Sequence, residues 1–302
     1  MRNVLAYTKS NIYKTWLLLT GFFIFVIGVG WLFSYIFETR AILVIAVGIS
    51  FLMSFISYWY SDKIVLAMSR AKQVKEDQAP VLYKIVKELC QKAKIPMPKI
   101  YIIDEQAPNA FATGRNPKNS AVAVTVGLLN ILNQDELKGV IAHELSHIKN
   151  KDILLQTIVV VLVGSIVLLS DFLLRWTIWG GGGRRREQNG GQFQAILLVI
   201  GILAAILTPI IAKLIQLAIS RKREFLADAS GALLGRCPEG LARALEKISK
   251  NATPLRVANK ATAHLYIANP LKENQTKGLA KLFMTHPPIE ERVKALKEMV
   301  IK

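Results

Sequence analysis

The chain has 302 residues, of which 52% are hydrophobic and 20% are charged, and its formal net charge is +18. This composition excludes an ordinary soluble domain and fits a polar body joined to several membrane helices. The two cysteines, Cys90 and Cys237, lack a metal-type spacing, so we interpret both as free thiols in a reducing compartment.

Four apolar runs of roughly membrane-span length interrupt the polar sequence. They cover residues 15–37, 41–61, 153–170 and 195–212. About 17 to 25 apolar residues cross a bilayer as a helix, so the first two runs fit easily and the last two are at the short end. The alternatives are a hairpin buried in a soluble core and, for the last two runs, a re-entrant or interfacial hairpin. We predict four transmembrane helices in two hairpins.

The positive charge predicts the orientation of these helices. With four crossings, residues 1–14, 62–152 and 213–302 lie on one side and hold 34 of the 39 lysines and arginines. Basic residues favour the cytoplasmic side. We therefore expect a multi-pass protein of the cell membrane with both termini in the cytoplasm. Its segments would be a transmembrane hairpin at 1–61, a second hairpin at 153–212, and two cytoplasmic parts between and after them.

One connection opposes this orientation. The Gly- and Arg-rich stretch 180–191 places three arginines on the predicted outer side, and arginines in short loops resist translocation. Either this loop crosses, or the last two runs do not fully span the bilayer. Elsewhere the basic residues flank membrane runs without interleaved aromatics, so we expect the lipid bilayer as a partner and no nucleic acid. The oligomeric state is not indicated.

The polar segments mix helices with a small sheet, which predicts an α+β membrane protein. Residues 62–98 have helical periodicity that breaks near Pro80, and residues 99–104 form a short strand. "NAFATG" and residues 121–127 alternate around the turn-rich "RNPKNS", which predicts a β-hairpin with a long loop. Further amphipathic helices are expected to begin at or just after prolines near residues 238 and 288.

The stretch "HELSH" carries the clearest chemistry. Asn133, followed by Glu136, predicts a capped helix that contains it. On a helix His143 and His147 share a face and can bind one metal ion, while Glu144 reaches a water bound to that ion. This is the arrangement of zinc peptidases, which need a third protein ligand and an open fourth position.

The third ligand is not fixed by spacing. The remaining histidines are His264 and His286, beside several carboxylates. If the last two runs form a hairpin, the helix after it emerges beside the "HELSH" helix and carries Glu224 and Asp228 on one face. Glu224 then fits a ligand and Asp228 a partner of a ligand histidine. The alternative is that both carboxylates are solvated and pair with nearby arginines.

Four short stretches together carry a resemblance. "NAFATG", "HELSH", "EFLAD" and "THPP", in this order along the chain, resemble the HtpX family of membrane zinc metallopeptidases, which is related to the CAAX-prenyl endopeptidases. The resemblance runs from the first apolar run to the C-terminal helix. It implies a mainly helical, zincin-like catalytic domain built from residues 62–152 and 213–302.

The resemblance also implies roles for individual residues. Zn2+ would be bound by His143, His147 and Glu224, with Asp228 supporting the site. Glu144 would activate water, and His286 would stabilise the oxyanion. Arg292 matches an arginine that usually follows this histidine, and its role is open. His264 matches no catalytic position, so we expect it to be structural.

A substrate-binding strand is implied as well. The resemblance places Asn109, Ala110 and Phe111 on an exposed sheet edge, where a substrate can add as a further strand. The alternative is an ordinary hairpin strand.

These observations predict a membrane-bound zinc metalloendopeptidase that cleaves membrane-protein substrates at the cytoplasmic surface. The resemblance adds a role in stress response and quality control of misfolded or damaged membrane proteins. One alternative is a site-2-type intramembrane protease, but charged residues on both sides of "HELSH" argue for an aqueous site. Another is a chaperone or scaffold with a structural metal, but no fourth ligand is evident.

Overall fold

The protein is seen in a computed structural model that describes residues 2–36, 38–180, 221–251, 253–258, 262–270 and 287–299. The described part is mostly helical and contains one four-stranded sheet. Its elements in chain order are α1 (Arg2–Ile36), α2 (Arg40–Met68), β1 (Lys72–Gln73), α3 (Pro80–Ala93), β2 (Lys99–Ile103), β3 (Ala110–Asn116), β4 (Asn119–Thr125), α4 (Val126–Ile131), α5 (Gln134–Lys149), α6 (Asp152–Gly180), α8 (Arg221–Gly235), α9 (Pro238–Lys250), a short 3-10 helix η1 (Ala263–Leu265) and α10 (Ile289–Lys297). The fourth predicted run, 195–212, and His286 lie outside the described residues.

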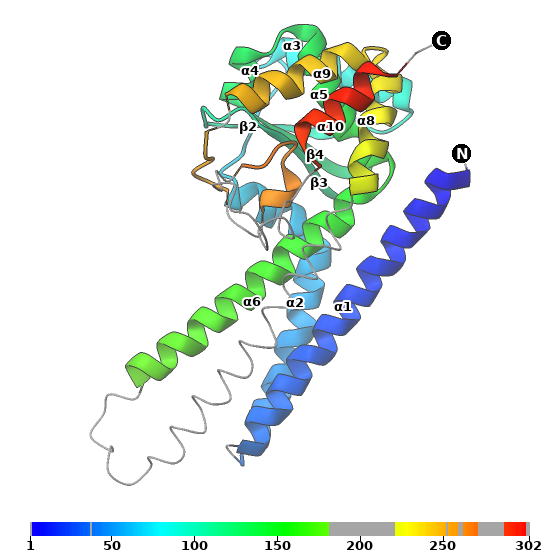
Figure 1. Cartoon of the computed structure of the whole chain (residues 1–302). Coiled ribbons are helices and arrows are strands. Elements are labelled where there is room, and N and C mark those ends of the chain that lie inside the picture. Colours follow the sequence, from blue (N-terminus) through cyan, green and yellow to red (C-terminus); the bar gives the residue numbers. More distant parts are fainter. Residues whose placement is uncertain are drawn as a thin grey trace.

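The first two apolar runs form a helical hairpin below a compact head (Figure 1). The segments apolar enough to cross a membrane are Ser10–Tyr35 in α1 and Arg40–Met68 in α2. Only 22% and 11% of their most apolar windows are buried, so most of their surface faces outward, as lipid contact requires and a soluble core would not allow. The described residues hold two such helices, or three if α5 and α6 count as one bent span. The predicted total of four spans stays a prediction.

The third apolar run begins α6, which leaves the head beside α1 and α2 (Figure 1). Leucines and a phenylalanine of α1 pack against aliphatic side chains of α6, among them Leu18, Leu19, Phe22, Leu155, Ile158 and Leu162. The "HELSH" helix does not run on into α6, because α5 ends at Lys149 and α6 turns away from it by 84°. Lys151 occupies the left-handed region at this break, with φ of 58°.

The sheet has the strand order β1-β2-β4-β3, which leaves β3 at one edge. β2 and β4 are parallel, whereas β3 and β4 form the predicted antiparallel hairpin. The predicted long loop is wrong, because Asn116 pairs with Asn119 and only Pro117 and Lys118 make the turn. The strands extend into "RNPKNS" since backbone pairing continues past an irregularity at Gly114. The two-residue strand β1 was not predicted.

Both faces of the β3–β4 hairpin are buried. Ala110 and Ala112 face the main core of the head, which includes α3, α5 and α9. Phe111 faces the other way, into a cluster with Val65 and Leu66 from the last turns of α2. The second apolar helix therefore continues without a break into the core of the head.

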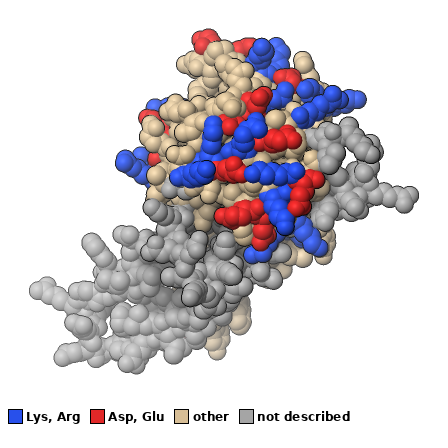
Figure 2. Space-filling view, turned by 45° about the horizontal axis from the view of Figure 1, so that its top comes forward, with Lys and Arg blue, Asp and Glu red and all other residues tan. Residues whose placement is uncertain are grey.

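The predicted helix starts are confirmed where they fall on described residues. Asn133 Oδ1 accepts from the Glu136 amide at 2.9 Å, and Glu136 Oε2 accepts from the Asn133 amide at 2.9 Å, so α5 begins with the expected capping box. Figure 2 shows basic and acidic side chains interspersed on one face of the head. Lys297, for instance, lies 2.7 Å from Glu246. Such a surface is typical of contact with water.

Gly231 allows α8 to lie directly against α5. A Cβ at this position would lie 2.8 Å from the backbone nitrogen of His143 and 2.9 Å from its Cα. Only a residue without a side chain fits there unless the two helices move apart.

We predict that Gly231→Ala lowers the free energy of unfolding by about 1–3 kcal/mol, as overpacking typically does. The control is Gly164→Ala in α6, where a Cβ would meet no atom within 4 Å. Thermal unfolding of both variants in the same detergent measures the difference. A Gly231→Ala protein as stable as the control would show that the helices have room to spare.

Candidate metal centre

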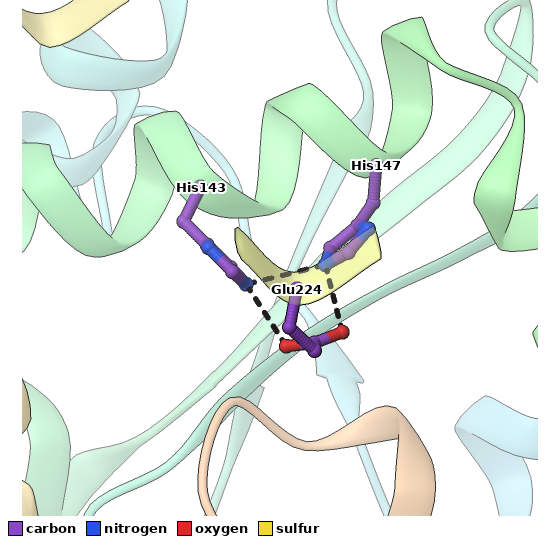
Figure 3. A group of neighbouring side chains, drawn as sticks. All are labelled: His143, His147 and Glu224. Carbon is purple, nitrogen blue, oxygen red and sulfur yellow. Dashed lines mark hydrogen bonds and ion pairs between the residues drawn. The ribbon is translucent and has the colours of Figure 1, made fainter. Parts of the chain in front are cut away.

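Three side chains converge where α5 meets α8 (Figure 3). His143 and His147 lie one turn apart on α5, and their Nε2 atoms are 3.2 Å apart. Glu224, in the first turn of α8, places Oε2 at 3.7 Å from His143 Nε2 and Oε1 at 3.7 Å from His147 Nε2. All three side chains are buried. The structure thus brings together the two histidines and the carboxylate that the sequence singled out.

A carboxylate lies behind each imidazole ring. Asp228 Oδ1 is 2.9 Å from His143 Nδ1, and Asp152 Oδ2 is 3.0 Å from His147 Nδ1. A carboxylate only accepts, so the hydrogen bond with Asp152 places the ring proton on His147 Nδ1 and a lone pair on its Nε2, and the closeness of Asp228 favours the same tautomer for His143. Two lone pairs and a carboxylate therefore face one another in a buried space, which is unfavourable without a cation between them.

The separations suit a tetrahedral zinc ion. Nitrogen and oxygen ligands lie about 2.0–2.2 Å from zinc, which places two tetrahedral ligand atoms about 3.3–3.5 Å apart. The three separations here, from 3.2 to 3.7 Å, lie close to that range. Two histidines and one glutamate leave the fourth position open, as in catalytic rather than structural zinc sites.

The same acceptor atoms also attract a proton. Burial opposes a charge on His147, but the hydrogen bond with Asp152 and the negative charges nearby outweigh it and raise its pKa to about 9. Burial raises the pKa of Glu144, although the neighbouring imidazoles partly offset the effect. A carboxyl group with a raised pKa can both accept and return a proton near neutral pH.

Arg292, whose role the sequence left open, holds Asp228. Its Nε donates to Asp228 Oδ2 at 2.8 Å and its Nη2 to Asp228 Oδ1 at 2.7 Å. Burial alone would raise the pKa of Asp228, but the guanidinium lowers it well below its usual range. Arg292 also donates from Nη1 to the Ile267 carbonyl at 2.8 Å. This fully buried arginine therefore ties α10, α8 and the chain beyond η1 to the back of His143.

Asp152 is the residue near the site that sequence reasoning missed. It follows His147 by five residues, which on a continuous helix would point it to a different face. The only available signal was an acidic residue just before the third apolar run, and that is also what a helix start would show.

The two histidines that the sequence left outside the ligand pair differ in what the structure shows of them. His264 is buried, with Nε2 at 3.1 Å from the Gln156 carbonyl, and burial lowers its pKa to about 4. These contacts fit the structural role expected for it. His286 cannot be compared, since it lies outside the described residues.

Asn109, Ala110 and Phe111 stand at the start of the edge strand β3, but their outer side is already in contact with the chain itself. The Ala110 carbonyl accepts from the Ile267 amide at 2.9 Å, and Asn109 Nδ2 donates to the Ala268 carbonyl at 3.0 Å. Phe111 is buried against Tyr266, with ring centroids 5.2 Å apart. Their predicted role in substrate binding stays a prediction.

Comparison with known proteins shows which protein family this chain resembles. The model of a family described as peptidase family M48 matches residues 76–300. A protease HtpX homolog of Thermoanaerobacter pseudethanolicus is 46% identical over 97% of this chain and 96% of its own length. Similar homologs from Syntrophobacter fumaroxidans and Pyrococcus abyssi are 48% and 47% identical over 85% and 91% of this chain, covering 89% and 91% of their own lengths. A crystal structure of S. mikatae Ste24p aligns with a TM-score of 0.48 and 19% identity, over 98% of this chain and 67% of that one.

Apolar helices joined to a head that holds two histidines and a glutamate define a membrane metalloprotease. The chain belongs to peptidase family M48. Its relatives carry the HtpX name, so the resemblance seen in the sequence is confirmed.

We predict that Glu224→Ala weakens zinc binding more than about 100-fold, since losing a ligand should cost at least as much as losing its hydrogen-bonding support. Zinc bound per chain, measured by elemental analysis after dialysis, gives the result. Glu239→Ala, which removes an exposed glutamate from α9, serves as the control and should keep its zinc. Full zinc in the Glu224→Ala protein would assign the third ligand elsewhere.

Proposed function

We propose that the chain is a zinc-dependent endopeptidase that hydrolyses peptide bonds of membrane proteins at the cytoplasmic surface of the cell membrane. One observation carries this proposal: two imidazole nitrogens and a carboxylate converge, with Glu144 next to one ligand, at the head end of the apolar helices. Membership of a peptidase family supports peptide hydrolysis as the reaction.

In the proposed mechanism His143, His147 and Glu224 hold the zinc ion. When bound there, zinc supplies a Lewis acid that polarises a peptide carbonyl and lowers the pKa of a water molecule to about 7. Glu144 accepts the proton of the attacking water and returns it to the leaving amine, a task to which its raised pKa is suited. The resemblance implies that His286 stabilises the oxyanion that develops on the peptide carbonyl.

The edge strand β3 is the proposed binding place for an extended substrate. A peptide that adds to a sheet edge is held by main-chain hydrogen bonds, whatever its sequence. Because the Ala110 carbonyl is engaged by Ile267, a substrate strand either begins beyond this residue or displaces the segment around Ile267. Asn109, Ala110 and Phe111 would in the second case exchange one strand partner for another.

The proposed location rests on the distribution of positive charge. Most basic residues lie in the segments assigned to the cytoplasm, namely 1–14, 62–152 and 213–302. Two hairpins, at 1–61 and 153–212, would anchor a catalytic domain formed by the two larger segments. The resemblance to the HtpX family supports a role in quality control of damaged membrane proteins.

An intramembrane protease is the second candidate, and one observation favours it. α5 and α6 together are apolar enough to count as one broken span. However, α5 packs on protein rather than lipid, since its buried side chains join the core that contains α3, β4 and α9. A non-catalytic scaffold is less favoured, because the ligand set leaves one position of the metal open.

We expect Glu144→Gln to keep its zinc and lose peptide cleavage, with turnover reduced by about 10²- to 10⁴-fold. The substitution preserves the shape of a buried side chain and replaces a carboxylate that can accept a proton by a neutral amide that cannot. Cleavage of a model membrane substrate and zinc content are measured on the same preparation, with Glu239→Gln as the control. Undiminished turnover would remove Glu144 as the base.

Mapping the cleaved bonds separates the two candidate proteases. We expect cuts in substrate segments that lie outside the bilayer, identified by mass spectrometry of products from a substrate with one defined span. Cuts at mid-span residues would favour the intramembrane candidate instead.

A further inference from the structure

Asp152 connects a histidine of the metal centre to the first apolar helix. Its Oδ2 lies 3.0 Å from His147 Nδ1, and its Oδ1 accepts a hydrogen bond from Asn11 Nδ2 at 2.6 Å. The guanidinium of Arg223 lies 3.7 Å from the same Oδ1. All these side chains are buried, and Asn11 comes from α1, 141 residues away in the chain.

The break between α5 and α6 makes this contact possible. On an unbroken helix, residues five apart point about 140° away from each other. Here the chain turns by 84° after Lys149, with Lys151 in the left-handed region, and Asp152 returns beneath His147. A left-handed lysine costs about 1–2 kcal/mol, so the surrounding contacts must stabilise it.

The carboxylate has a definite effect on the ring. Bound to Nδ1, it keeps the proton on that atom, directs Nε2 toward Glu224, and fixes the plane of the imidazole. Asp228 orients the ring of His143 in the same way. Asp228 itself is held by a hydrogen bond from Arg292, which belongs to a helix of the head. Asp152, the carboxylate behind His147, is held by the neutral amide of Asn11, which belongs to a helix of the membrane hairpin.

The position of Asn11 depends on how α1 packs in the membrane part. Below Asn11, side chains such as Leu18 and Phe22 pack against α6, the helix that begins with Asp152. A shift of α1 by one turn would move Asn11 by about 5.4 Å, and the bond to Asp152 would be lost. The packing of α1 on α6 therefore sets whether Asp152 is held.

We propose that Asp152 is a positioning residue for His147 and that Asn11 holds it in place, so that the first apolar helix forms part of the support of the metal centre as well as an anchor. This inference rests on the proposed role of His143, His147 and Glu224 as zinc ligands. It adds a requirement for α1 that anchoring alone would not explain.

The test compares zinc affinity in the full-length chain in detergent, by competition with a chromophoric chelator. We expect Asp152→Ala to bind zinc about 10- to 100-fold more weakly, as loss of such a partner usually does. Asp152→Asn keeps an acceptor oxygen without the charge and should lie between this variant and the unaltered protein. Asn11→Leu, which keeps the branch at Cγ but loses the amide, should weaken binding about 3- to 10-fold, because it acts only through Asp152.

Thr15→Val is the matched control for Asn11→Leu. Thr15 lies one turn further along α1, is equally buried, and bonds only to the Asn11 carbonyl among the described contacts. Its zinc affinity should equal that of the unaltered protein. The electronic absorption spectrum of the cobalt-substituted protein is a second readout, and it should change in Asp152→Ala and not in Thr15→Val.

Several outcomes would overturn the inference. Asp152→Ala and Asp152→Asn with unaltered zinc affinity and cobalt spectrum would remove Asp152 as a positioning residue. Asn11→Leu with the affinity of Thr15→Val would remove the contribution of α1. If Asp152→Ala does not fold, Asp152→Asn and Asn11→Leu decide. Absence of zinc binding in the unaltered protein, or full zinc in Glu224→Ala, would instead overturn the proposed ligand set and this inference with it.

Discussion

Buried negative charge exceeds buried positive charge around the two histidines of α5. Among the described residues, four buried carboxylates and two buried guanidinium groups surround the rings: Glu144, Asp152, Glu224 and Asp228, with Arg223 and Arg292. Fully ionised, these six groups leave a formal charge of −2, from −4 and +2, and a proton on His147, whose pKa is raised to about 9, offsets one of these charges. Uncompensated charge in a dry interior is expensive, whereas a divalent cation between the ligands would bring the sum to zero. This excess of negative charge suits the group of side chains to bind a divalent cation.

The charged and polar side chains around the centre come from segments that are far apart in the sequence. α5 contributes the histidines and Glu144, α8 contributes Glu224 and Asp228, and α10 contributes Arg292. Gly231 lets α8 approach α5 closely enough for Glu224 to meet the two histidines. α1 and α6 contribute Asn11 and Asp152 from the membrane side. Removing any of these side chains takes away one partner of a buried charged or polar group, so the contacts around the centre link the head to the first and third apolar helices.

Local patterns in the sequence predicted the local features of the structure. Spacing placed His143 and His147 on one helical face, and the Asn133 and Glu136 pair marked the helix start, because both depend on residues within one or two turns. Apolar runs located the first hairpin for the same reason. The break at Lys151 was not visible, since lysine is not a usual residue in the left-handed region and tertiary contacts must impose it. Without that break, the contact of Asp152 with His147 could not be foreseen, and the role of Arg292 depended on a contact across 64 residues.

The length of α2 has a mechanical consequence for the proposed protease. Its 29 residues extend about 43 Å at 1.5 Å per residue, whereas the hydrocarbon core of a bilayer is about 30 Å thick. The excess enters the head, where Val65 and Leu66 pack beneath the sheet. One continuous helix thus joins the apolar hairpin to the head, so that in the proposed membrane arrangement a stiff connection would set the distance between the candidate metal centre and the bilayer. A substrate segment would then have to reach that distance from the bilayer to be cleaved.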